Sequence, residues 1–569
     1  MNRKNLPEGW RWVNLGDLGE TRMGGTPKTN VSKYWDREEV IWITPEDMQE
    51  GYVNFIFQSR RMISLVGLEE SSTKLLPPDS VILSTTASIG KVGIAQVPLA
   101  TNQQLTGIVT NHLVNPIFLA YYLLHLRNDG LANLGGTTTA THINQGSLRK
   151  LTIPLPPLPV QERIVQILQK ADEIRQKRKQ ALELVEVIAR ALFVSMFGEP
   201  GSNSQRWPTG PLNDLLSPEI ERVNPRAAFP DEEFTYIEIA GIRDFRIVDV
   251  KRLKGADAPS RARQVVRGGD VLYSMTRPNL RKIAVVPEEL DGAICTTGFA
   301  VLRPRNPQDS AFIFEIVKSD YFTDSMSRLA EAKSLYPAVD EAQVRQFTVI
   351  QPPGPARAHF GAVMDRLSGI TSLSRAYSEI SDAVFSSLLT RAFTGELTAE
   401  WEAANTDLIA EQQALHERLP RLLLLALLAE KAKRGGQSAA TVLVTALMKY
   451  VFLLQMEGGA ARRRLYHFVP YHYGPFAKEL YSDLDKLQDE GLVRIEKDAP
   501  EDKTKITLAD PVRIDEAIAA LPDEIKQDVA TIIETYGDLD HNALLNAVYE
   551  KYPTYARKSR QKQKGRTSK

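Results

Sequence analysis

The stretch TIPLPPLPVQERIV at residues 152–165 is repeated in outline by TVIQPPGPARAHFG at residues 348–361. In both places a short apolar segment rich in β-branched residues passes through prolines into a long helical pattern. Proline is favoured at the first position of a helix, so each stretch predicts a strand followed by a helix start. Because the same order of signals occurs twice, the chain is predicted to contain two copies of one structural unit.

The repeat continues downstream as two long helical patterns. Apolar residues alternate at spacings of three and four over residues 164–192 in the first copy and over residues 360–388 in the second. Polar Arg178 and Ser374 interrupt the two patterns at the same position, and each pattern ends near a glycine suited to a helix C-cap. This is the spacing of a coiled-coil seam, so we expect the two helices to pack against each other in antiparallel orientation.

The segments that precede the two helices also correspond. PPDSVILSTTASIGKVGIA (77–95) and RGGDVLYSMTRPNLRKIAVV (267–286) both have strand–turn–strand signals, and a further strand and helix follow each. We call residues 1–155 the first head and residues 201–350 the second head. The expected fold is α+β, with two such heads separated by two long antiparallel coiled-coil helices and related by a pseudo-twofold axis.

The polar residues of the heads indicate a nucleic-acid ligand. The second head is dense in arginine and lysine, whereas the first head offers hydroxyls and amides. These side chains contact base edges and phosphates in DNA, although a single polar loop is more often a solvated turn. The predicted DNA contacts are Lys28, Asn30, Lys33, Thr85, Thr86, Lys91, Gln103 and Gln104 in the first head, and Arg243, Arg246, Arg277, Asn279, Arg281, Lys282 and Lys333 in the second.

Composition adds limits on location and chemistry. The 569 residues contain 70 Lys plus Arg and 70 Asp plus Glu, so the overall charge indicates no partner. Cys295 is the only cysteine, which excludes an intrachain disulfide and a cysteine-based zinc site. No apolar signal core opens the sequence, and the longest apolar run, 422–429, is too short to span a membrane. We therefore expect a cytoplasmic protein.

From about residue 6 to residue 397 the chain resembles the specificity subunits of type I restriction–modification systems. The resemblance lies in the opening LPEGWRWVNLGDLG, the stretch GGTPKTNVSKYW…VIWITPEDM, the two proline-to-helix junctions and the ending MFGEP of the first helix. The second junction, PPGPARAHF, departs from the form of the first. The family implies two target-recognition domains, each reading half of a bipartite double-stranded DNA site. It further implies helices that set the spacer and dock two methyltransferase subunits, with motor-nuclease subunits joining for restriction in host defence.

The expected domain organisation follows from the repeat. It comprises a first target-recognition domain (1–155), a first spacer helix (156–200), a second target-recognition domain (201–350), a second spacer helix (351–400), a C-terminal domain (401–555) and a basic, disordered tail (556–569).

Sequence motifs for catalysis are incomplete. NPIF (115–118) has an isoleucine where the adenine-binding loop of N6-adenine methyltransferases needs a second proline, and no glycine-rich cofactor loop precedes it. IGKVG (89–93) lacks the spacing of a phosphate-binding P-loop. PDEEFTYIEIA (230–240) has an alanine where a nuclease pattern needs lysine. His467 and His472 lack an evident third metal ligand. The sequence predicts a non-catalytic subunit without metal or cofactor.

The region after residue 400 lies outside the repeat. Its order of helix, helix, strand, turn and strand is typical of a winged-helix module. The helix at 441–459, followed by YHYGPF at 471–476, resembles the antitoxin-associated Panacea domain, which implies a protein partner. A winged module alone could bind DNA, and a plain helical extension is a third possibility. The alternative function is therefore a toxin–antitoxin or phage-defence regulator, whose C-terminal domain binds a protein and whose repeat anchors it to DNA.

Overall fold

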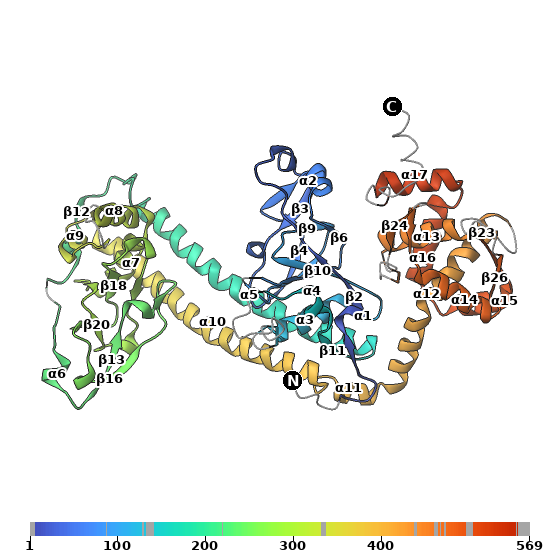
Figure 1. Cartoon of the computed structure of the whole chain (residues 1–569). Helices are drawn as coiled ribbons and strands as arrows, with labels where there is room; N and C mark the ends of the chain where they lie inside the picture. Colours follow the sequence, from blue (N-terminus) through green and yellow to red (C-terminus); the bar gives the residue numbers. More distant parts are fainter. Residues whose placement is uncertain are drawn as a thin grey trace. The chain divides into compact units, whose positions relative to one another are not determined.

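The computed structural model describes residues 6–86, 88–127, 130–131, 142–218, 220–331, 337–436, 441–459, 465–466, 468–471, 474–496, 504–552 and 555. The chain divides into two compact units, residues 1–173 with 383–569 and residues 174–382, whose parts are coloured along the sequence in Figure 1. Both long helices are cut by this division, so each unit contains one end of each helix. In the part of the chain that is described, no helix is long and apolar enough to cross a membrane.

The first head is built on two sheets. The five-stranded sheet has the order β2 (Gly19–Met23), β10 (Leu105–Thr110), β7 (Val81–Ser84), β8 (Val92–Ala95) and β4 (Val53–Ile56). The four-stranded sheet has the order β5 (Arg61–Ile63), β3 (Val40–Ile43), β9 (Leu99–Thr101) and β6 (Leu75–Leu76). A separate strand pair joins β1 (Arg11–Asn14) to β11 (Thr152–Leu155). The helices are α1 (Leu15–Leu18), α2 (Leu65–Glu70), α3 (Pro116–His125) and α4 (Gln145–Arg149).

The second head contains a four-stranded sheet with the order β16 (Lys251–Lys254), β13 (Glu233–Ile237), β20 (Ile294–Thr296) and β17 (Ala262–Val265). A three-stranded sheet has the order β19 (Ile283–Val285), β18 (Val271–Ser274) and β21 (Phe299–Leu302). Two strand pairs join β12 (Thr209–Pro211) to β22 (Thr348–Ile350) and β14 (Ile242–Arg243) to β15 (Arg246–Ile247). The helices are α6 (Pro225–Ala228), α7 (Ser310–Lys318), α8 (Asp320–Glu331) and α9 (Glu341–Arg345).

The two heads repeat one strand arrangement. In the first head, β3 pairs antiparallel with β5 and parallel with β9, and β9 pairs antiparallel with β6. In the second head, β13, β16, β20 and β17 make the same three pairings. The order β10–β7–β8 likewise corresponds to β21–β18–β19, while β2 and β4 extend only the first head's sheet. The predicted repeat of one structural unit is therefore confirmed at the level of strand order.

The long helices are α5 (Leu158–Phe197) and α10 (Gly354–Thr394). In the first unit, Ile164 and Leu168 near the start of α5 share a core with Phe385 and Phe393 near the end of α10. In the second unit, Phe193 near the end of α5 lies 5.6 Å, ring centre to ring centre, from Phe360 near the start of α10. Within each unit, opposite ends of the two helices therefore pack together.

Between their ends the helices bury their seam less than the heptad pattern predicts. Ile174 is 44% exposed, Ile188 is 45% exposed and Tyr377 is 52% exposed, although all three are seam positions in the sequence. Near the ends, α3 of the first head and α7 of the second add further packing partners, such as Tyr121 against Phe385. A pair of helices without a third element covers less of each side chain, so this part of the seam prediction is wrong for the described side chains.

The polar interruption at Arg178 has a direct role in the second unit. Its guanidinium donates to Tyr377 O at 3.0 Å and also to Ser381 Oγ. One turn earlier, Arg175 forms an ion pair with Asp382 at 2.8 Å. Polar contacts of this kind replace apolar packing where the seam is open to solvent.

The C-terminal part of the first unit has its own core. It contains α11 (Ala399–Ala404), α12 (Thr406–Arg434), β23 (Thr441–Leu443), α13 (Val444–Glu457), β24 (Val469–Tyr471), β25 (Gly474–Phe476), α14 (Glu479–Asp489), β26 (Val493–Glu496), β27 (Lys505–Leu508), α15 (Pro511–Ala519), α16 (Asp523–Tyr536) and α17 (His541–Lys551). Strands β23, β27 and β26 form one antiparallel sheet. The leucine-rich end of α12 packs with α13, α14, α16 and α17 in this core.

The first half of α12 belongs instead to the surface of the first head. Gln413 Oε1 accepts a hydrogen bond from Leu158 N at 2.9 Å, and His416 Nε2 lies 2.5 Å from His112 O. Just before α12, Glu402 accepts from Trp10 Nε1 at 3.1 Å. The histidines considered as metal ligands, His467 and His472, lie outside the described residues.

Candidate nucleic-acid interface

Three segments of the first head meet at the end of strand β7. Thr85, which follows β7, donates from its backbone N to Gln104 O at 2.9 Å, in the turn between β9 and β10. Ile143 N donates to Thr85 O at 2.8 Å, and the Thr86 hydroxyl lies 2.9 Å from His142 Nδ1. The strand end, the turn at 102–104 and the segment at 142–143 therefore form one polar edge, which we call the first edge.

The second head forms the same edge from corresponding residues. Met275, which follows β18, donates from its N to Gly298 O at 3.0 Å, and Val339 N donates to Met275 O at 2.9 Å. Thr276 forms an antiparallel bridge with Ala338, as Thr86 does with His142. We call the residues at 275–282, 297–298 and 337–339 the second edge. One backbone frame therefore carries different side chains in the two heads.

Buried polar side chains fix the turns of both edges. In the first head, Thr73 Oγ1 donates to Thr101 O at 3.0 Å. In the second head, the Gln264 amide donates to Thr296 O and to Phe299 O, each at 3.1 Å, on the two sides of the turn at 297–298. Thr101 and Thr296 end the corresponding strands β9 and β20. An unsatisfied buried carbonyl is costly, so these donors stabilise one conformation of each turn.

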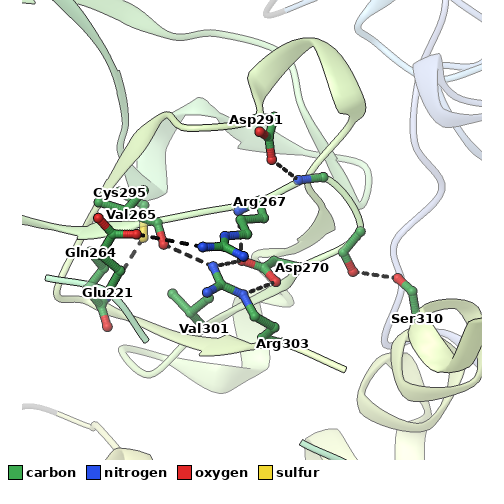
Figure 2. A network of polar contacts seen from close by, with 12 residues as sticks. Glu221, Gln264, Val265, Arg267, Asp270, Asp291, Cys295, Val301, Arg303 and Ser310 are labelled. Carbon is green, nitrogen blue, oxygen red and sulfur yellow. Dashed lines mark hydrogen bonds and ion pairs between the residues drawn. The ribbon is translucent and has the colours of Figure 1, made fainter. Parts of the chain in front are cut away.

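An ion pair lies at the start of β18, at the opposite end of this strand from the second edge. Arg303 forms an ion pair with Asp270 at 2.8 Å, and the Asp270 side chain is only 1% exposed (Figure 2). Asp270 also accepts from Arg267 N at 2.8 Å, and Ser310 Oγ donates to Gly269 O at 2.6 Å. The Asp270 carboxylate raises the pKa of Arg303, and burial raises the pKa of the Cys295 thiol beside Gln264 to about 12. The single cysteine is therefore a packed, protonated side chain.

A close backbone approach shapes the first edge. A Cβ on Gly24 would lie 2.1 Å from both Asn102 O and Thr101 Oγ1, so only glycine fits against the turn. Two residues later, the Thr26 hydroxyl bonds to the side chain of Gln103. The GGTP motif at 24–27 and the TNQQ motif at 101–104, which the sequence presents as separate polar stretches, are thus neighbours.

The predicted contacts of the first head divide into exposed and internally bonded residues. Lys28, Asn30 and Gln103 are exposed, and Thr86 is half-buried. Lys33 is paired with Glu70 at 2.7 Å, which raises the pKa of the lysine, and Lys91 Nζ donates to Pro45 O at 2.6 Å. Gln104 accepts from the Asn102 amide at 2.8 Å. The prediction that Thr85 contacts DNA is wrong, because Thr85 is 1% exposed and its hydroxyl faces Thr106 inside the sheet.

In the second head, Arg277 and Asn279 are exposed on the loop between β18 and β19, and Arg243 is exposed on the β14–β15 hairpin with half-buried Arg246 beside it. Arg281 and Lys282 instead hold this loop to the body of the head. Arg281 donates to Lys318 O at 3.1 Å, and Lys282 donates to Ile242 O at 2.6 Å. Lys333 lies outside the described residues.

Sequence reasoning missed His142 and an aromatic cluster. The predicted contacts do not include His142, although the 196-residue offset places it opposite Ala338, and the two residues occupy the same place in the edges. The cluster consists of Trp35 and Trp42, with Arg61 stacked 4.2 Å from the centre of the Trp35 ring. Nothing in the spacing of Arg61 indicates this contact, since the β3–β5 pairing creates it. No group of three or more potential metal ligands occurs among the residues the structure describes.

Residues 7–184 match the family described as the type I restriction modification DNA specificity domain. The specificity subunit of the MjaIX type I restriction enzyme of Methanocaldococcus jannaschii is 30% identical over 221 residues, covering 38% of this chain and 50% of that protein. The EcoR124I/EcoR124II specificity subunit of Escherichia coli is 29% identical over 169 residues, covering 29% of this chain and 41% of that protein. The matches thus span half or less of these two relatives.

A weaker similarity extends further along the chain. The StySPI specificity subunit of Salmonella potsdam is 20% identical over 476 residues, which is 77% of this chain and 99% of that protein. The crystal structure of a type I restriction–modification S subunit from M. genitalium is 13% identical, covers 69% of this chain and 97% of that chain, and gives a TM-score of 0.45. Residues 7–184 thus match the domain model of this family, and the chain is similar in sequence to proteins named specificity subunits.

Proposed function

We propose that this chain, whose residues 7–184 match the DNA specificity domain of type I restriction–modification systems, is the DNA sequence-specificity subunit of such a complex. The observation that carries the proposal is the repeated edge. Two heads with the same strand pairings present different side chains on the same backbone frame. Such a pair reads two different half-sites, one per head, of a bipartite double-stranded DNA sequence.

The long helices act in this proposal as a spacer. Helices α5 and α10 pair in antiparallel orientation, hold the heads apart and set the number of unread base pairs between the half-sites. A 40-residue helix such as α5 is roughly 60 Å long at about 1.5 Å per residue. That length is on the order of one to two turns of B-DNA, at about 34–36 Å per turn.

The exposed apolar residues of the helices are the proposed docking surface for two methyltransferase subunits. Within the second unit, Leu184 is 56% exposed, Val187 is 62% exposed and Ile380 is 58% exposed. Leu184 and Val187 are three residues apart on α5 and so lie on one face of this helix, and exposed apolar surface of this kind marks protein interfaces. The chain itself is non-catalytic in this proposal, and motor-nuclease subunits join the assembly for restriction.

The test is reconstitution. The chain is co-expressed with candidate methyltransferase subunits and purified by a tag on this chain, and the host DNA is then sequenced by a single-molecule method that detects N6-methyladenine. We expect co-purification and a two-part motif with a fixed gap that is lost when the chain is deleted. Unchanged methylation after deletion would overturn the proposal.

A second candidate function rests on the C-terminal part, which has a separate core. The second helix of the winged-helix order, α14, carries exposed Glu479, Asp485 and Asp489, and these would repel DNA phosphates. We therefore propose a protein partner for a Panacea-like module here. This partner would make the chain a toxin–antitoxin or phage-defence regulator if the repeat served only as its DNA anchor.

Truncation separates the two candidates. Removing residues 418–569 retains Gln413 and His416, which pack on the first head, and deletes the separate core. If the reconstituted complex still methylates the two-part site, the C-terminal domain is an accessory of the specificity subunit. The regulator is favoured by a different result. In that case neither the full chain nor the truncated chain supports methylation, and the truncated chain loses control of a partner's toxicity.

A further inference from the structure

The loop between β18 and β19 has a strained backbone. Arg277 has φ of +50°, Arg281 has φ of +50°, and a turn of 3-10 helix, Pro278–Leu280, lies between them. Non-glycine residues in the left-handed region are strained and persist only where the surrounding structure imposes them. The loop therefore has one imposed shape.

Contacts on both sides of the loop impose that shape. Arg277 N donates to Pro337 O at 2.9 Å, and Ser274 Oγ donates to Thr276 O at 3.0 Å. After the turn, the Arg281 guanidinium reaches the junction of α7 and α8, where it bonds to Lys318 O, Thr323 Oγ1 and Asp320. The loop is thus clamped to the second edge at its start and to two helices at its end.

The clamped loop displays three side chains outward. Pro278 is buried, whereas Arg277 and Asn279 are exposed and Leu280 is 52% exposed. Among the described residues, neither the Arg277 guanidinium nor the Asn279 amide has a hydrogen-bond partner. The backbone that carries the three side chains is therefore held in place, while their recognition groups are unused.

The chemistry of these side chains matches base edges in the DNA major groove. Arginine pairs with guanine O6 and N7, asparagine pairs with adenine N6 and N7, and an apolar side chain contacts the C5 methyl group of thymine. Leucine has no hydrogen bond to offer to a phosphate or to water. Single exposed leucines are common on protein surfaces, but this one lies beside two base-reading side chains on a loop of imposed shape.

We propose that Leu280 is a specificity-determining residue, which packs against the C5 methyl group of a thymine in the half-site read by the second head. The inference rests on the proposed function and deepens it. It assigns at least one A·T pair to that half-site, close to the base pairs contacted by Arg277 and Asn279.

Deoxyuridine provides the direct test, because it differs from thymidine only by the absent methyl group. Once the bipartite site is known, each thymine of the second half-site is replaced in turn, and binding by the complex of this chain with its methyltransferase subunits is measured. One replacement is expected to weaken binding about fourfold, which corresponds to the burial of one methyl group. Leu280→Ala is expected to bind the thymine duplex about fourfold more weakly and to lose the distinction between thymine and uracil.

The matched control is Leu65→Ala in the first head, where Leu65 is 47% exposed on α2. This variant is expected to keep the wild-type response to uracil in the second half-site. A wild-type complex that binds the two-part site but ignores uracil at every position overturns the role of Leu280. So does a Leu280→Ala complex that still distinguishes uracil, or a second half-site without any A·T pair. A complex that binds no two-part site at all overturns the proposed function as well.

Discussion

Gln264 is 2% exposed, and its amide donates to backbone carbonyls on both sides of the turn at the second edge. Its role could not be predicted from sequence, because a glutamine in an arginine-rich segment is equally suited to a surface. The exposed loop residues Lys28, Asn30, Arg277 and Asn279 were predictable, since loops rich in such side chains lie at surfaces. The burial of Thr85 could not be predicted, because the Thr-Thr pair at 85–86 does not indicate which of the two residues points inward.

Gln264→Leu is predicted to relax the second half-site. Leucine has a similar volume but leaves Thr296 O and Phe299 O without this donor, at a cost of about 1–3 kcal/mol. The turn at 297–298 then loses its fixed conformation, so the ratio of specific to nonspecific DNA binding should fall while nonspecific binding stays unchanged. Competition binding measures that ratio. Thr73→Val removes one of two donors to Thr101 O, since Gly25 N also donates to it at 2.8 Å, so the first half-site should relax less.

Lys449 of α13 gives a prediction on stability. It is fully buried, its Nζ donates to Thr445 O at 3.0 Å, and burial lowers its pKa from 10.5 to about 8. Between pH 8 and 10.5 the unfolded chain binds more protons than the native chain, so native stability should rise with pH across that window. Lys449→Met is predicted to stabilise the C-terminal domain at pH 7 by roughly 2–3 kcal/mol and to remove this rise.

Thermal unfolding measured from pH 7 to pH 10.5 checks this prediction. Exposed Lys505 is the control, and Lys505→Met should leave both the midpoint and its pH dependence unchanged. Equal behaviour of the two variants would show that Lys449 carries no burial cost in the native state.

At the scale of elements, the long helices were the most predictable part of the fold. The heptad pattern is local, and it places the helices close to the observed bounds Leu158–Phe197 and Gly354–Thr394. Which seam residues are buried depends on distant elements such as α3 and α7, so exposed Ile188 and Tyr377 could not be identified from the pattern. In the C-terminal part, α12, α13, α14, β26 and β27 follow the sequence signals. Residues 441–443, predicted as the start of a helix, instead form β23, and β24, β25 and the helices α15 to α17 are not among the predicted elements.

Val187→Asp on α5 is predicted to reduce co-purification with methyltransferase subunits at least tenfold without unfolding the chain. Val187 is 62% exposed, so a charge there costs little in the free chain but is buried without a partner in the docked complex. Val512→Asp on α15 is the control at an equally exposed valine, 68% exposed. Retained co-purification of the Val187 variant would place the methyltransferase contact elsewhere.

The contact between α12 and the first head is predicted to weaken in acid. Burial and the neighbouring His416 lower the pKa of His112 below its usual 6.5. The native state therefore favours neutral His112, and its contribution to stability is complete above pH 6.5 and is lost as the pH falls below that value. His112→Gln should flatten the fall in unfolding midpoint between pH 7 and pH 5, whereas His359→Gln, at an exposed histidine of α10, should not.

At the scale of the whole molecule, the duplication was predictable and the strand order was not. The proline junctions at 152–165 and 348–361 repeat in the linear sequence, so an offset comparison finds them. The parallel pairing of β3 with β9, and of β13 with β20, joins strands more than 50 residues apart and has no local signal. The proposed function was predictable from the duplication, because two copies of one frame with different edges indicate two related ligands.

The central claim is that each head reads its own half-site. The direct measurement is the N6-methyladenine motif, determined by single-molecule sequencing, in cells that carry either the wild-type chain or the double variant Arg277→Ala, Asn279→Ala. We predict that the variant keeps the first half-site and the gap but loses base preference in the second half-site, by about 1–3 kcal/mol per lost contact. An unchanged motif, or relaxation of both half-sites together, would contradict the assignment of one half-site to each head.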